Sequence, residues 1–240
     1  MVKSRRGFLI SSLGALGFAL LLQQYPVNSS APKLITLMAI LGAWVGLTIY
    51  FWPRKKPRIV VLMFPVLLAL PFILPGRVLD PVELRQEYLE RLSGFEGTKY
   101  FWGGESSRGI DCSGLPRRAY RDALLQSGFR SANGRAFRSW LEQWWYDASA
   151  RALGAGYRDY TVSLEVTGTI RGMDYEGLEP GDLAVTSSGV HILAYLGEGQ
   201  WIQADPGLGE VAILDGRTSE NPWFRGPVTT HRWRALAEAR

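Results

Sequence analysis

The first third of the chain is strongly apolar, and the remainder mixes short apolar and polar stretches. Three apolar runs contain no charged side chain: residues 7–22, 34–52 and 59–75. A helix that crosses a bilayer needs about 20 apolar residues, with a range of about 17–25, and prolines such as Pro65 and Pro71 in the third run are tolerated there. We therefore predict about three transmembrane helices in a membrane region of residues 1–76, followed by a domain of residues 77–240.

Basic residues flank these runs unevenly. Lys3, Arg5 and Arg6 precede the first run, and the RKKPR segment at 54–58 separates the second from the third, whereas the loop between the first two runs carries only Lys33. Because basic loops stay in the cytoplasm, the N-terminus and the RKKPR turn are predicted to be cytoplasmic. Everything after about Gly76 is then outside.

Residues 4–10, SRRGFLI, allow another interpretation, since they resemble a twin-arginine export signal that is cleaved from a soluble protein. No small-x-small cleavage site follows, and two more apolar runs come after it. Either route carries the rest of the chain across the membrane.

Helical patterns come first in the outer domain. Asp80 before Pro81 and Glu83 is typical of a helix start, and apolar residues then recur at helical spacing. A second helix is predicted from about Cys112 or Ser113 to Gly128. A third is predicted around 137–152, where the stripe of Trp140, Trp144 and Trp145 favours core packing over a sugar- or peptide-binding platform.

Short β-branched or aromatic runs separated by glycine-rich turns follow at residues 162–166, 182–187, 190–197 and 200–205. Runs of this kind predict strands. Helices first and antiparallel strands after them indicate an α+β fold.

The composition removes several classes of site. The 240 residues include one cysteine and two histidines, so an internal disulfide is excluded and neither a zinc site nor any other metal or cofactor is expected. The net charge of +5 is explained by the residues that flank the apolar runs, so no nucleic-acid partner is expected. His231 lies in the basic segment THRWRALAEAR and is predicted to be a solvated surface residue.

The single cysteine, Cys112, lies among small, polar, turn-forming residues in GTKYFWGGESSRGIDCSGL, residues 97–115. A helix that begins at this cysteine would place the sulfur at the positive end of the helix dipole, beside free backbone N–H groups. Both effects favour the thiolate, which is the nucleophile, so a lowered thiol pKa is expected. The same N–H groups could stabilise an oxyanion.

His191 is the natural base, and the hairpin that follows it decides its partner. A plain two-residue turn at Glu198 and Gly199 would place Gln203 opposite Ala194, facing away from His191. A three-residue loop with Gly199 left-handed shifts the pairing by one. Gln203 then shares the face of His191 and can orient the imidazole, with Asp205 as the alternative orienting residue.

These residues resemble the NlpC-type cell-wall cysteine endopeptidases of the papain-like superfamily. The resemblance lies in three ordered blocks: YFWGG with DCSGL, LEPGDLAV, and HILAYLGEGQWIQA. It implies a papain-like domain in which N-terminal helices pack on an antiparallel sheet. It also implies six site residues: Cys112 as nucleophile, His191 as base, Gln203 as orienting residue, Tyr100 near the thiolate, and Asp111 and Ser113 near the substrate.

Three features depart from the family pattern. Pro116, Arg117 and Arg118 replace the apolar residues usual after DCSGL. The third residue of the triad is glutamine, where histidine is common. The segment of about residues 127–177 between the blocks is long and rich in tryptophan.

The resemblance implies a cysteine peptidase, and the apolar runs and the charge asymmetry place it in the bacterial cytoplasmic membrane with its catalytic domain on the extracytoplasmic side. Its substrates would be peptidoglycan stem peptides or muropeptides, cut at amide bonds that are commonly between D-glutamate and a diamino acid. Two other classes stay open: a non-catalytic membrane module that binds cell-wall peptides or a partner protein, and a cysteine acyltransferase acting on lipid. The lipid bilayer is the other expected partner, and the sequence does not indicate an oligomeric state.

Overall fold

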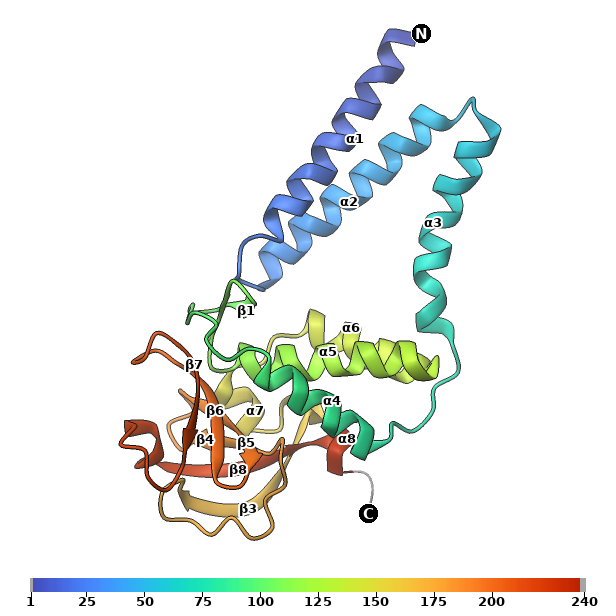
Figure 1. Ribbon diagram of the computed structural model, residues 1–240. Coiled ribbons are helices and arrows are strands. Elements are labelled where there is room, and N and C mark those ends of the chain that lie inside the picture. The colour runs from blue at the N-terminus through green and yellow to red at the C-terminus, as the bar shows by residue number, and fades with distance from the viewer. Residues whose placement is uncertain (1, 238–240) are drawn as a thin grey trace.

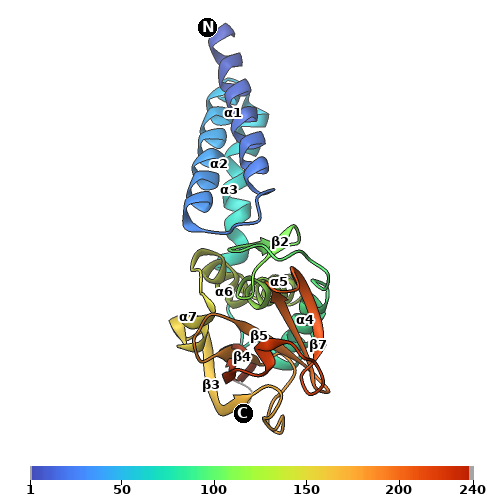
Figure 2. The same cartoon turned by 90° about the vertical axis from the view of Figure 1, so that its left-hand side faces the viewer.

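The structure is a computed structural model that describes residues 2–237, with side chains from Arg5 onward. The side chain of Lys3, part of the predicted cytoplasmic cluster, lies outside the described residues. A bundle of long helices stands on one side of a globular α+β domain (Figures 1 and 2).

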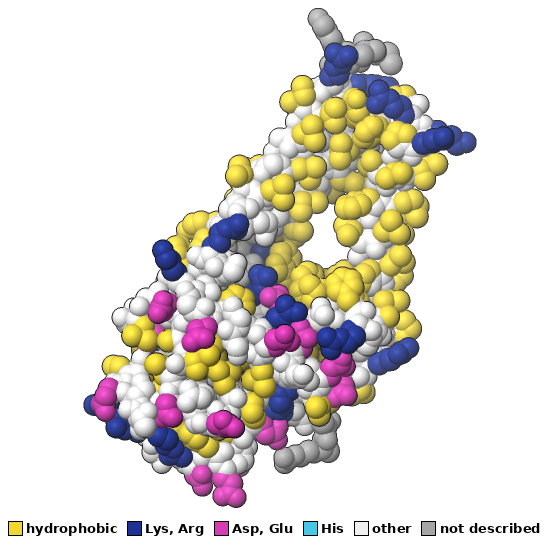
Figure 3. Space-filling model, viewed as in Figure 1, with side chains coloured by type: hydrophobic (Ala, Val, Ile, Leu, Met, Phe, Trp, Pro, Cys, Tyr) yellow, Lys and Arg dark blue, Asp and Glu magenta, His cyan; other side chains and the backbone are white. Residues whose placement is uncertain are grey.

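Within residues 2–237, three helices are long and apolar enough to cross a membrane: α1 (Val2–Leu22), α2 (Ser30–Phe51) and α3 (Lys55–Ile73). α1 and α2 pack side by side, and α3 diverges from α2 towards the domain (Figures 1 and 2). The backbone of Gly46 in α2 approaches α1 so closely that a Cβ there would lie 2.3 Å from Ser12 Oγ. Apolar side chains cover the visible faces of these helices (Figure 3).

Charge is distributed unequally along the bundle. The α2–α3 turn and the start of α3 carry Arg54, Lys55, Lys56 and Arg58, at the end of the bundle away from the domain (Figure 1). Acidic side chains gather on the domain instead (Figure 3), and no acidic residue precedes Asp80. The charge asymmetry of the sequence therefore becomes an asymmetry between the two ends of the helices.

The helices of the domain are α4 (Pro81–Ser93), α5 (Gly114–Ser131), α6 (Gly134–Trp145), α7 (Ala150–Gly154) and α8 (Arg234–Ala237). The predicted cap of α4 is confirmed, since the Asp80 carboxylate accepts from the N–H groups of Val82 and Glu83. The predicted second helix was placed slightly wrongly: α5 begins at Gly114, with Ser113 at the N-cap, and runs past Gly128.

The predicted helix over residues 137–152 is two helices. α6 ends at Trp145, and Ser149 caps α7 by accepting from the N–H of Ala152 at 3.2 Å. The aromatic face of α6 reaches the ends of the long helices that adjoin the domain, with the Phe72 ring 6.5 Å from the Trp140 ring and Lys33 Nζ 5.7 Å from the Trp144 ring. The tryptophan stripe thus joins the domain to the long helices.

The described domain contains a six-stranded antiparallel sheet of order β3-β8-β4-β5-β6-β7. Its strands are β3 (Thr161–Thr169), β4 (Leu183–Thr186), β5 (Ile192–Gly197), β6 (Gln200–Asp205), β7 (Glu210–Asp215) and β8 (Pro227–Trp233). A short pair, β1 (Glu105–Ser106) and β2 (Gly109–Ile110), precedes α5. β7 and β8 were not predicted, and β8 returns from the C-terminal end to lie between β3 and β4.

The prediction for His231 was wrong. It lies in β8 opposite Ser163 and Leu183, is only 4% exposed, and shares a 2.9 Å hydrogen bond with the Thr229 hydroxyl. The basic residues around it indicate a surface segment when read locally. They do not reveal that the strand inserts into the middle of the sheet.

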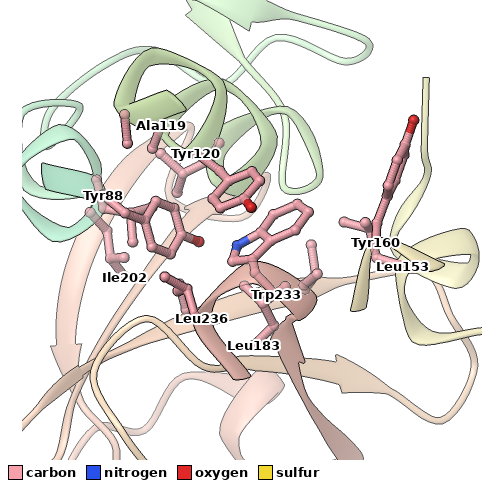
Figure 4. Packing of buried hydrophobic residues seen from close by; sticks show 14 of the residues in the cluster. Tyr88, Ala119, Tyr120, Leu153, Tyr160, Leu183, Ile202, Trp233 and Leu236 are labelled. Atoms are coloured by element: carbon pink, nitrogen blue, oxygen red, sulfur yellow. The ribbon is translucent and has the colours of Figure 1, made fainter. Parts of the chain in front are cut away.

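An aromatic cluster fixes the helices against the sheet (Figure 4). The Tyr120 ring of α5 stacks on Trp233 of β8 at 4.2 Å, and Tyr88 of α4 meets both rings edge-on. Stacked and edge-to-face aromatic pairs stabilise beyond the area they bury. α5 is thereby held to the sheet, which sets the place of Cys112 relative to His191, the residue before β5.

Candidate active site

A tight turn holds Cys112 just before α5. The Asp111 carboxylate accepts from the N–H groups of Gly103 at 2.8 Å and Gly114 at 2.6 Å, and from the Ser113 hydroxyl at 3.0 Å. The start of α5 also lies against Gly104, since a Cβ on Gly114 would come within 2.2 Å of the Gly104 carbonyl oxygen. Asp111 and the glycines therefore build the turn that presents the thiol.

The thiol faces the strand that carries His191. Cys112 Sγ lies 3.8 Å from the carbonyl oxygen of Val190, the residue before His191. The predicted nucleophile and the predicted base are thus brought together from positions 79 apart in the sequence.

The expectation of a lowered thiol pKa was wrong. Burial raises the pKa of Cys112 to about 12, and the negative charge of Asp111 adds to this effect. The backbone N–H groups of Ile192, Ser113 and Cys112 act in the lowering direction but do not outweigh burial. α5 begins two residues after the cysteine, so the helix terminus is also less close than the sequence indicated.

The register of the β5–β6 hairpin is the predicted one. Ala194 pairs with Ile202 and Tyr195 with Trp201, and the same register continued places Gln203 opposite Leu193. Its cause differs from the prediction. Gly197 pairs with Gln200, so the turn has two residues, both with positive φ, and a bulge between Tyr195 and Gly197 shifts the pairing by one.

A chain of buried hydrogen bonds assigns the proton on His191. A carboxylate only accepts hydrogen bonds, so the Gln203 atom that lies 3.2 Å from Asp205 Oδ2 is the donor Nε2. Gln203 Oε1 therefore faces His191 Nε2, at 2.7 Å. Since Oε1 also only accepts, His191 Nε2 carries the proton. His191 Nδ1 is then the ring nitrogen with a free lone pair.

Asp205 is held in turn by the loop that follows β7 and by the turn that precedes it. Asn221 Nδ2 donates to Asp205 Oδ2 at 2.5 Å, and the N–H of Gly207 donates to Oδ1 at 2.7 Å. Asn221 Oδ1 accepts from the N–H of Trp223, which sets the direction of its amide. Asp205 therefore orients Gln203, which orients His191.

Trp223 completes the surroundings of the imidazole. Its ring stacks on His191 with centroids 4.1 Å apart and planes 15° apart. His191 is 1% exposed, and burial lowers its pKa, although Gln203, Asp205 and Asp111 act in the raising direction. The sequence did not indicate Asn221 or Trp223, because neither lies in a motif or near the triad in sequence.

Tyr100 interacts electrostatically with the Cys112 thiol. Burial raises its pKa to about 12, and negative charge on Cys112, Asp111 and Asp205 acts in the same direction. Its backbone N–H donates to the Gly209 carbonyl at 2.7 Å, which fixes this segment beside the loop after β6. Tyr100, Cys112 and His191 thus each interact electrostatically with Asp111, and the Ser113 hydroxyl donates to the same carboxylate.

Comparison with protein-family models gives a match to the NlpC/P60 family over residues 97–225, more than half of the 240-residue chain. The chain belongs to the NlpC/P60 family. The matched range includes Cys112, His191 and Gln203, and the α+β architecture with helices packed on an antiparallel sheet is the one predicted. Comparison with curated protein sequences gives no match.

Solved structures resemble this NlpC/P60 chain at low identity. NlpC1 from Trichomonas vaginalis is 20% identical with a TM-score of 0.42, over 64% of this chain and 45% of that one. The peptidoglycan hydrolase RipB from Mycobacterium tuberculosis is 22% identical with a TM-score of 0.37, over 62% of this chain and 65% of that one. The chain thus spans less than two thirds of the length of these proteins.

The raised pKa of the thiol gives a prediction for the NlpC/P60 domain. Cys112 is the only cysteine, so iodoacetamide reports on it alone. In the folded chain, the pH midpoint of alkylation is expected above the free-cysteine value of about 8.5; in denaturant it should return to that value. A folded-state midpoint at or below the free value would show that the N–H groups of the turn outweigh burial.

Proposed function

We propose that the chain is a membrane-anchored cysteine peptidase that hydrolyses amide bonds in peptidoglycan stem peptides. The observation that carries the proposal is the hydrogen-bond chain from Asp205 through Gln203 to His191, together with the approach of Cys112 Sγ to within 3.8 Å of the carbonyl oxygen of Val190, the residue before His191. A thiol next to an oriented imidazole is the arrangement that nucleophilic catalysis requires. A binding module needs none of these three side chains.

The acylation step begins from an uncharged pair. Burial raises the pKa of Cys112 and lowers the pKa of His191, so both are neutral near pH 7. As Sγ attacks the carbonyl carbon, His191 Nδ1 takes the thiol proton. The backbone N–H groups of Cys112 and Ser113 stabilise the oxyanion. His191 then gives the proton to the leaving amine, the C–N bond breaks, and a thioester remains on Cys112.

Deacylation uses the same groups in reverse. Water loses a proton to His191 Nδ1 and attacks the thioester carbonyl carbon. The C–S bond breaks, His191 returns the proton to sulfur, and the carboxylic acid product leaves. Gln203 accepts from Nε2–H throughout, so the positive charge that His191 carries between transfers forms in a fixed ring.

The substrate class follows from membership of the NlpC/P60 family. We propose a bond between D-glutamate and a diamino acid of the stem peptide as the bond cut. The test is incubation of the purified full-length chain, in detergent, with peptidoglycan, with muropeptides and with phospholipid, followed by mass spectrometry. New amine and carboxylate termini in the peptide support the proposal. Transfer of acyl chains, or no product from any substrate, overturns it.

We also propose that the domain lies outside the cytoplasmic membrane, with the α2–α3 turn inside. This orientation is supported by the basic residues at the end of the helices away from the domain. A reporter that is active only in the cytoplasm is expected to be silent when fused after Arg240 and active when inserted in the α2–α3 turn. The opposite pattern would reverse the orientation and remove cell-wall peptides as substrates.

A further inference from the structure

The loop between α1 and α2 lies against the catalytic domain. The carbonyl oxygen of Pro26 accepts from the N–H of Glu105 at 2.9 Å, and Val27 forms an antiparallel bridge with Gly104. The Tyr25 ring meets Phe101 edge-on at 6.0 Å. Residues 25–28 thus extend the β1–β2 pair, which lies immediately before the turn that carries Cys112.

A buried ionic cluster lies under this contact, and its centre is Glu105, which is 2% exposed. The Asn28 side-chain amide donates to Glu105 Oε2, and Arg121 and Arg117 pair with the same carboxylate at 3.0 and 3.5 Å. Burial alone would raise the pKa of Glu105, but the two arginines and Asn28 hold it below its ordinary value. One of the hydrogen bonds that the Glu105 carboxylate accepts therefore comes from the membrane region.

A second ion pair ties α2 to the same cluster. Lys33, 3% exposed, lies 2.8 Å from Asp147, and Arg117 lies 3.3 Å from the same carboxylate. Arg117 therefore contacts both acids. This accounts for its presence where the NlpC-type pattern has an apolar residue: the position faces the charged contact with the α1–α2 loop.

The cluster connects directly to the nucleophile. Arg117 Nε donates to the carbonyl oxygen of Ser113, the residue after Cys112, at 3.2 Å. On the other side, the Gly104 carbonyl accepts from the N–H of Asp111, the residue before Cys112, at 3.0 Å. Asp111 is thus held by Gly104, which bridges Val27, and Ser113 is held by Arg117, which pairs with the carboxylate that Asn28 contacts.

We propose that Asn28 and Glu105 are positioning residues of the active site, through which the α1–α2 hairpin holds the turn that carries Cys112. One consequence of this inference rests on the proposed function. A movement of α1 and α2 that withdraws Asn28 from Glu105 lowers the turnover of muropeptides. The membrane region then affects catalysis and is not only an anchor.

The test is a charge exchange in the full-length chain in detergent. Asn28→Asp places two carboxylates together. Glu105→Gln removes the carboxylate with which the two buried arginines pair. The double variant restores an amide–carboxylate pair with the two groups exchanged. Gln24→Asp is the matched control, because it adds the same charge to the same loop at an exposed position. The measurements are the pH midpoint of Cys112 alkylation, kcat and KM on muropeptides, and the melting temperature.

Losing a buried hydrogen bond to a charged group is expected to lower kcat of Asn28→Asp about tenfold with KM unchanged. Its alkylation midpoint should fall towards that of free cysteine, as water reaches the sulfur, while the domain stays folded. The double variant should recover both values to within about threefold of wild type. The Gln24→Asp control should match wild type.

The proposal is overturned if Asn28→Asp behaves like Gln24→Asp, or if the double variant is no better than the worse single variant. Alkylation needs no substrate, so the outcomes separate the two hypotheses. A chain that cleaves no muropeptide but shows the midpoint changes would refute the peptidase and support the positioning role.

Discussion

Cys112→Ala is expected to abolish hydrolysis of muropeptides by the full-length chain, lowering kcat/KM by about 10⁴-fold or more. Alanine removes the sulfur that forms the thioester, and the sequence contains no second cysteine to replace it. Cys112 lies in a turn held by Asp111, so the melting temperature should stay close to that of wild type. Initial rates with muropeptides, measured beside circular dichroism, test both statements.

Cys112→Ser is the matched control, because it keeps the size and polarity of the side chain but is a far weaker nucleophile. It too should be inactive. Retention of full activity by Cys112→Ala in a folded protein would refute the cysteine mechanism and, with it, the proposed roles of His191 and Gln203.

Gln203→Ala is expected to lower kcat by about 10²-fold, the lower end of what a positioned general base contributes. The substitution removes the acceptor of His191 Nε2–H, so the ring can rotate and either nitrogen can hold the proton. Gln203→His should retain more activity, since a histidine nitrogen can accept the same hydrogen bond. Gln200→Ala, on the same strand but bonded to Asp215, is the control.

Asp205 gives an informative third variant. Asp205→Asn turns an acceptor into an amide that meets two donors, Gln203 Nε2 and Asn221 Nδ2. A flip of the Gln203 amide would relieve this contact between donors. The flipped amide would present its NH₂ group to His191 and so move the ring proton to Nδ1. Activity should fall, but less than in Gln203→Ala, and the pH–rate profile should change. If Asp205→Asn is inactive while Gln203→Ala is fully active, Asp205 and not Gln203 orients the base.

Features that depend on nearby residues could be predicted from the sequence alone. The apolar runs, the Asp80 cap and the hairpin register are properties of contiguous segments whose side chains meet at fixed spacings. Membership of the NlpC/P60 family was predictable for a related reason, since its motifs lie in short ordered blocks. The predicted hairpin register was right, although a bulge in β5 and not a longer loop produces it. Both a bulge and a longer loop shift the pairing by one residue and put Gln203 on the face of His191.

Features that depend on distant residues were decided only by the tertiary structure. β8 inserts between β3 and β4 and buries His231, and no local pattern shows which strands will be neighbours. The pKa of Cys112 depends on how much chain covers the sulfur, so burial reversed an expectation based on the helix terminus alone. Asn221 and Trp223 reach the site from a loop beyond β7.

The contact between the membrane region and the active site is the clearest case. Asn28 meets Glu105 across 77 positions of sequence, and Lys33 meets Asp147 across 114. In the sequence, Lys33 is an isolated charge in a loop and Arg117 is a departure from a motif. They become partners in one buried cluster because folding removes water from around them, and a buried charge must then find a counter-charge wherever the chain brings one.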